Sequence, residues 1–143
     1  MSEENKAVAR GVFEAWNRGD LDALDDPVAR DVVDHDPQDP HAGEGLEGLK
    51  KTITMYREAF PDVNFTVEEQ VAEGDLVATR WTATGTHEGE LMGMQPTGKQ
   101  ATVTGMAIDR IEGGKIVEAW GNWDTLGLLQ QIGAIPAAEP AQA

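Results

Sequence analysis

The residues best placed for chemistry lie at the end of a strand that the sequence predicts over residues 116–123. Side chains along a strand alternate between its two faces, so Asn122 and Asp124 share a face with Trp120. A carboxyl beside an indole is partly removed from water, which favours its neutral form and suits it to proton transfer near neutral pH. Asp124 also directly precedes a predicted helix, so the alternative role is to cap that helix.

The histidines are the next candidates for acid/base or ligand-binding roles. His35 lies between two aspartates, which would stabilise its charged form. A metal site built from His35, His41 and Asp39 is disfavoured, because this stretch is a loop broken by prolines and metal ligands must converge. His87 ends another predicted strand, where it faces either a pocket mouth or water. We therefore predict no metal site.

Arg80 lies in the middle of the strand predicted over residues 76–87. An inward-facing arginine needs a carboxylate or an anionic ligand, whereas an outward-facing one is an ordinary surface charge. Strict alternation places Arg80 and His87 on opposite faces, and a β-bulge at Gly85 would bring them to the same face. The sequence leaves both arrangements open.

Composition excludes several classes of function. The chain has no cysteine, no glycine-rich phosphate loop, and a single serine, Ser2, which lies in no nucleophile motif. The chain contains 11 Lys and Arg residues and 26 Asp and Glu residues, and its net charge of −15 disfavours nucleic-acid and membrane-surface partners. No apolar run is long enough for a membrane span. We expect a soluble cytoplasmic protein, whose acidity either aids solubility or reflects a saline habitat.

The elements that position these residues follow from hydrophobic periodicity. Apolar residues at helical spacing predict an N-terminal helix, a short second helix and a longer amphipathic one, at 8–16, 21–24 and 46–60. After a brief extended segment at 31–35, alternation predicts strands at 63–67, 76–87, 101–111 and 116–123, with a last helix at 125–132. Helices followed by an antiparallel meander indicate an α+β fold.

The order of elements also predicts a ligand cavity and a domain boundary. The helices can cover only one face of the sheet. If the sheet curves around them, the cone-shaped space between sheet and helices could hold a small ligand. Val117, Ala119 and Trp123 would then lie on the open face, an apolar surface that predicts a homodimer. We expect one domain over residues 1–135 and a disordered Ala/Pro-rich tail over 136–143.

Six segments, in this order, carry a family resemblance. They are VDHDP at 33–37, YREAFPD at 56–62, RWTATGTHEG at 80–89, PTGK at 96–99, GKIVEAW at 114–120 with Asp124, and LLQQIG at 128–133. Together they resemble the SnoaL-like polyketide cyclase family, also called ester cyclases. The resemblance implies a fold like nuclear transport factor 2, a strongly curved antiparallel sheet wrapped around N-terminal helices, with a pocket in the cone.

The resemblance also implies an activity. Characterised cyclases of this family close a carbocyclic ring by intramolecular aldol addition, without metal or organic cofactor, using an aspartate on the last strand. Asp124 matches that position, and with His35 it is the expected catalytic pair. The residues expected to bind substrate are Arg80, His87, Asn122, Trp120 and Tyr56. A second acid/base histidine of the family is missing from residues 103–108.

The expected function is therefore cofactor-free acid/base catalysis, an intramolecular aldol or related enolate reaction, on a small apolar carbonyl substrate. The alternative is a non-catalytic module on the same fold, for binding a small ligand or for dimerisation. Epoxide hydrolysis, which is also known on this fold, ranks below both because the segment from Arg80 to Thr82 lacks an Arg-x-Asp motif.

Overall fold

The computed structural model describes residues 2–37 and 39–136. The first half contains α1 (Ser2–Arg18), the short 3-10 helix η1 (Leu21–Leu24), β1 (Val28–Asp34), the 3-10 turn η2 (Ala42–Glu44) and α2 (Gly45–Ala59). The second half contains β2 (Asn64–Glu73), β3 (Leu76–Thr86), β4 (Gln100–Glu112), β5 (Lys115–Trp123) and α3 (Thr125–Gln131). The predicted α+β class is confirmed, and β1 begins three residues before the extended segment expected at 31–35.

Five strands form one sheet in the order β1-β5-β4-β3-β2. Strands β2 to β5 make the predicted antiparallel meander. Strand β1 pairs with β5 in parallel, with Asp34 opposite Ala119, a pairing that the sequence did not indicate. A parallel pair needs a long connection between its strands, and here α2 and the whole meander supply it.

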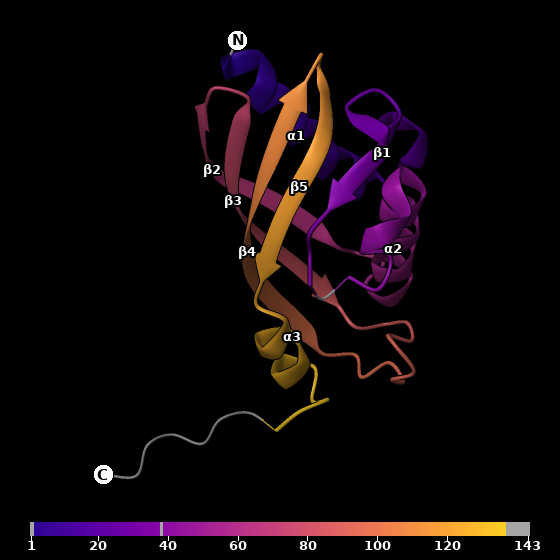
Figure 1. The fold of residues 1–143 in the computed structure, drawn as a ribbon. Helices are drawn as coiled ribbons and strands as arrows, with labels where there is room; N and C mark the ends of the chain where they lie inside the picture. Colours follow the sequence, from indigo (N-terminus) through magenta and orange to yellow (C-terminus); the bar gives the residue numbers. More distant parts are fainter. Residues whose placement is uncertain (1, 38, 137–143) are drawn as a thin grey trace, which may run out of the picture.

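The helices cover one face of this sheet. Helix α1 packs on β2 and β3, α2 packs on β1, and α3 packs on β4 at the opposite end (Figure 1). Gly105 on β4 lets the sheet curve closely around its contents, because a Cβ atom there would overlap the ring of Trp81. The curved sheet and the two long helices therefore enclose a space lined by side chains from both.

Buried apolar residues fill the two ends of this enclosure. One cluster joins α1, η1, α2 and the β1–β5 edge, with Leu24, Val28 and Ile53 almost fully buried. The other lies under α3 and contains Phe60 and Ile132. An aromatic group between them forms one wall of the cavity described below. The first cluster thus fixes α1 and α2, the second fixes the C-terminal end of α2, and the space between them stays open.

The packing around Ile53 can be tested by truncation. Ile53 is fully buried, so Ile53→Ala should leave a cavity and lower the free energy of unfolding by about 2–5 kcal/mol in urea titrations. The control is Leu126→Ala on the exposed face of α3, expected to change the same free energy by less than about 0.5 kcal/mol. Equal losses in the two variants would contradict this packing.

Two expectations concern the ends and surfaces of the chain. The tail expected over 136–143 lies, apart from Pro136, outside the described residues. Within the described residues, no helix is both long and apolar enough to cross a membrane.

Candidate functional site

A cavity of about 230 Å³ lies between the inner face of the sheet and helices α1 and α2. Its wall is mostly apolar, with side chains from both long helices and all five strands. Pockets for drug-sized ligands measure roughly 300–1,000 Å³, so this cavity suits a small molecule.

Aromatic side chains form one wall of the cavity. The Phe65 ring lies 4.9 Å from Trp16 and 5.0 Å from Trp81, centroid to centroid. Tyr56 meets Trp123 edge-on, with the centroids 5.9 Å apart. Such tilted and edge-on rings hold one another in place. The wall offers a rigid apolar surface to a flat ligand.

Two carboxyl groups face the cavity from neighbouring parts of the sheet. Asp109 on β4 pairs with Ala119 on β5, and Ala119 pairs on its other side with Asp34 on β1. Residues opposite one another share a face, so both carboxyls point inward, with Cα atoms roughly 9–10 Å apart across two strand spacings. Both residues line the cavity.

Asp109 is the more deeply buried of the two. Its side chain is 8% exposed and has no hydrogen-bond or ion-pair partner among the described residues. Burial, and secondly the negative charge of Asp34, raise the pKa of Asp109 to about 7. A carboxyl with this pKa is present in both forms near neutral pH, so it can take up or release a proton.

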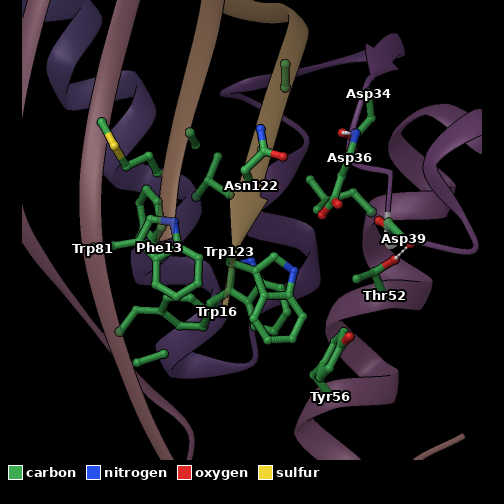
Figure 2. Close-up of a pocket in the computed structure, with 18 of the residues that line it drawn as sticks. Phe13, Trp16, Asp34, Asp36, Asp39, Thr52, Tyr56, Trp81, Asn122 and Trp123 are labelled. Atoms are coloured by element: carbon green, nitrogen blue, oxygen red, sulfur yellow. Dashed lines mark hydrogen bonds between the residues drawn. The ribbon is translucent and has the colours of Figure 1, made fainter. Parts of the chain in front are cut away.

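Three more polar residues lie near Asp109 and Asp34, namely Asp36 and Asp39 in the loop after β1 and Thr52 on α2. Burial raises the pKa of Asp34, opposed by the hydrogen bond that the Asp36 backbone N–H donates to Asp34 Oδ1, at 3.0 Å. The Thr52 hydroxyl donates to Asp39 Oδ1 at 2.8 Å. Figure 2 shows Asp34, Asp36 and Asp39 gathered on the side of Thr52 and Tyr56, opposite the wall of Phe13, Trp16 and Trp81.

Tyr56 supplies a hydrogen-bond donor at the same end. Burial, and then the charges of Asp39 and Asp36, raise its pKa to about 12, so the phenol keeps its proton at physiological pH. Its hydroxyl has no hydrogen-bond partner among the described residues, which leaves it available to a ligand. Tyr56, which the sequence analysis expected to bind substrate, lines the cavity.

Residues 6–132 match the sequence model of the SnoaL-like polyketide cyclase family. The chain belongs to this family. IdmH of Streptomyces antibioticus, a candidate polyketide cyclase, is 36% identical over 90% of this chain and 98% of its own, with a TM-score of 0.80. AclR of Streptomyces galilaeus, a candidate hydroxylase, is 32% identical over 97% and 87%, with a TM-score of 0.85. A candidate polyketide cyclase of Acidithiobacillus ferrooxidans is 32% identical over 94% and 97%, with a TM-score of 0.81.

These comparisons confirm the family and the fold that the six sequence segments predicted. A search of curated proteins finds no match. The solved relatives carry two different assignments, a cyclase and a hydroxylase, on one fold. Membership of the SnoaL-like family therefore leaves the reaction to be argued from the side chains of this cavity.

Asp124, the catalytic residue expected from the family pattern, lies outside the cavity lining. Its side chain is exposed and accepts a hydrogen bond from the Gly127 backbone N–H at 2.8 Å, which caps α3. The capping alternative left open by the sequence is thus what the structure shows. In this member of the family, Asp109 has the environment that was expected for Asp124.

His35 likewise does not line the cavity. Its ring stacks on Trp120 at 5.2 Å, and its Nε2 lies 2.8 Å from a carboxylate oxygen of Glu118. Glu118 also accepts from Arg110, whose guanidinium lies 5.8 Å from the Trp120 ring. Trp120 and Asn122, both expected at the pocket, are among its lining residues.

Arg80 and His87 lie on opposite sides of β3, as strict alternation required. The pairing of β3 with β4 runs without a break from Leu76 to Thr86, so there is no bulge at Gly85. Arg80 faces outward and pairs with Glu69 at 3.3 Å. His87 is fully buried against Phe60, and its Nδ1 accepts from the Thr97 backbone N–H at 3.2 Å. Neither residue lines the cavity.

The open face of the sheet also differs from the expected one. Ala119 and Trp123 line the cavity instead, because their β4 partners, Asp109 and Gly105, face the helices. Val33, Met106 and Ile108 are exposed and alternate with inward-facing residues, so their side chains point to the opposite face, although Met106 also borders the cavity. On β5 the cavity is therefore lined by Ala119, Gly121 and Trp123 as well as by the expected Trp120 and Asn122.

No group of three His, Asp or Glu residues that could hold a metal ion occurs among the described residues.

The sequence analysis missed Asp109, although the alternation of β4 contains a signal for it. It continues the inward alternation of β4, whose other members are the small or apolar residues Ala101, Val103, Gly105 and Ala107. A carboxyl in such a series is unusual enough to mark a site.

Proposed function

We propose that this protein catalyses an enolate reaction on a small carbonyl compound, with Asp109 as the acid/base group. The observation that supports this most is the environment of Asp109. It is a buried carboxyl with a pKa of about 7 on the wall of an apolar cavity, and it has no partner among the residues that the structure describes. A base works best when its pKa lies near the working pH. The assignment of solved relatives as candidate cyclases supports the reaction class.

The proposed reaction needs one proton to move twice. Ionised Asp109 removes a proton from the carbon next to a carbonyl, and the electron pair of that C–H bond moves to the carbonyl oxygen. The Tyr56 hydroxyl, and the Asn122 amide on β5, stabilise this enolate by donating hydrogen bonds. The enolate carbon then bonds to a second carbonyl carbon of the same molecule, and the new alkoxide takes the proton back from Asp109.

Exchange of the substrate's α-hydrogen with solvent tests the first half of this reaction. Cyclic and aromatic β-keto esters are incubated in D2O with the protein, and deuterium uptake is followed by NMR. Uptake above the buffer rate supports the enolate step, and its loss in Asp109→Asn assigns that step to Asp109. Binding without any uptake across the panel would instead favour the ligand-binding module.

We also propose that two copies pair through the open face of the sheet. Val33, Met106 and Ile108 are 50%, 55% and 41% exposed there. Some of the charged residues nearby are paired within the chain, namely Arg80 with Glu69 and Arg110 with Glu118. A second copy is the partner whose apolar surface matches.

If this dimer forms, light scattering at micromolar concentration should give a molar mass twice the 15.4 kDa of one chain. Ile108→Lys should convert it to a single chain, because a charge buried at the interface has no partner. Leu126→Lys, at an exposed residue of α3, is the control and should leave the mass unchanged. A parent protein of 15.4 kDa would rule out the dimer.

A further inference from the structure

The charged side chains that line the cavity, among the described residues, all have the same sign. They are Asp34, Asp36, Asp39 and Asp109. The remaining polar lining residues are neutral, namely Thr52, Thr84, Tyr56 and Asn122. No lysine, arginine or histidine appears among the described lining residues. A ligand in this cavity therefore meets a negative field.

The basic residues around the cavity are bound to other groups. Arg110 pairs with Asp75 at 3.0 Å and with Glu118 at 3.4 Å. Arg57 donates to the backbone carbonyl of Trp16 at 2.7 Å. None of the ion pairs between described residues includes Asp34 or Asp109. Among the described residues, His35 is the basic group whose charge opposes the raised pKa of Asp34, and it is paired with Glu118, whereas no basic group acts on Asp109.

Within this negative field, Asp109 is the position at which a cationic group would bind. The side chain is 8% exposed, lines the cavity, and accepts no hydrogen bond from the described residues. An ionised carboxylate removed from water is stable only with a partner of opposite charge or with hydrogen-bond donors. A ligand that carries a positive charge to this point would supply both.

The opposite wall is suited to an aromatic cation. The rings of Trp16, Trp81 and Trp123 face the space beside the carboxyls (Figure 2). Aromatic faces attract cations and also bury flat apolar groups. The described acidic residues form no cluster of three that could hold a metal ion, which favours an organic cation.

We propose that the cavity selects a small aromatic molecule that carries a protonated amine, with the ammonium group between Asp34 and Asp109 and the ring against the three indoles. This proposal deepens the proposed function and rests on it for the identity of the site. The ammonium group would hold Asp109 in its ionised form, which is the form that removes a proton from the substrate. Carboxylate and phosphate compounds would be rejected by the same field.

Three probes of one shape test the charge preference by binding alone. They are 2-naphthylmethylamine, 2-naphthylmethanol and 2-naphthoate, titrated into the protein in a calorimeter at pH 7. We expect the amine to bind at least about tenfold more tightly than the alcohol, and the carboxylate more weakly than either. Equal affinities for the amine and the alcohol, or no binding of the amine at millimolar concentration, would overturn the proposal.

The amine should also release protons as it binds. At pH 7 Asp109 is about half protonated, because its pKa is about 7. An adjacent ammonium group favours the ionised carboxylate, so titrations in buffers of different ionisation enthalpy should show release of up to about half a proton per amine. The alcohol should show none. This measurement uses the unmodified protein, so it does not depend on the folding of a variant.

Asp34→Asn identifies the carboxyl involved, with Asp36→Asn as a second variant if the first does not fold. The substitution should lower the amine's affinity about tenfold and leave the alcohol's within about twofold. Glu112→Gln, at an exposed residue of the β4–β5 hairpin, removes the same charge outside the cavity and should change neither affinity. An amine-to-alcohol ratio that stays the same in both cavity variants counts against the proposal.

Binding and exchange separate this proposal from the proposed function. Amine-selective binding without deuterium exchange in any amine-bearing ketone would sustain the ligand class and remove the catalytic function. Exchange of neutral esters together with equal binding of amine and alcohol would sustain catalysis and remove the preference for a cation.

Discussion

Asp109→Asn should reduce deuterium exchange of a responsive β-keto ester about a hundredfold or more. The amide has nearly the shape of the carboxyl but cannot accept the α-proton, and general acid/base groups typically contribute 10²–10⁴-fold. The rate constant of the parent should rise with pH through about 7, because the carboxyl must be ionised to act as a base. That rise should be absent from the residual activity of the variant.

Asp124→Asn is the matched comparison for this experiment. Asparagine caps helices as well as aspartate does, and the side chain of Asp124 lies outside the cavity lining. We therefore expect the exchange rate of this variant to remain within about twofold of the parent. If exchange collapsed in Asp124→Asn and survived in Asp109→Asn, the family-based assignment would hold and the role proposed for Asp109 would be wrong.

The sequence predicted the main helices and strands because each has a local signal, although α1 begins six residues earlier and β2 ends six residues later than expected. Apolar spacing along 46–60 and alternation along 101–111 match α2 and β4 within two residues at each end. The parallel pairing of β1 with β5 has no local signal, because it joins residues about 85 positions apart through backbone hydrogen bonds such as His35 N–H to the Ala119 carbonyl. Only the assembled sheet shows that Asp34 and Asp109 flank the same residue.

The candidate site was predicted less completely, because the face of the sheet on which a side chain lies depends on the register of its strand. The side-chain period of a strand is two, so an error in choosing the inner face exchanges every residue of the strand. The pattern of β5 favoured Trp120, Asn122 and Asp124 as the inner set, whereas Ala119 and Trp123 follow the inward face of β4. Trp120 and Asn122 still border the cavity, and Asp124 does not. Tyr56, expected to bind substrate, does line the cavity, because the helical stripe of α2 fixes its direction without any reference to a partner strand.

The second large effect concerns stability, and Asp109→Asn should stabilise the protein above neutral pH. The folded-state pKa of Asp109 is about 7, against 3.8 for an ordinary aspartate. Between these values the unfolded chain ionises while the folded chain keeps its proton, so the parent loses stability as pH rises. The loss is complete above pH 7 and amounts to roughly 2–4 kcal/mol, whereas an amide cannot ionise and escapes it.

Urea unfolding of the two proteins at pH 4 and pH 8 measures this difference. We expect free energies of unfolding that agree at pH 4 and differ in favour of Asp109→Asn at pH 8. Glu112→Gln removes the same charge at an exposed position and should show no such gain, which separates the buried carboxyl from the general effect of net charge. A variant that is less stable than the parent at pH 8 would mean that the ionised carboxylate has a stabilising partner. A more stable variant without activity would mean instead that the chain keeps a destabilising group at the one position where the proposed chemistry requires it.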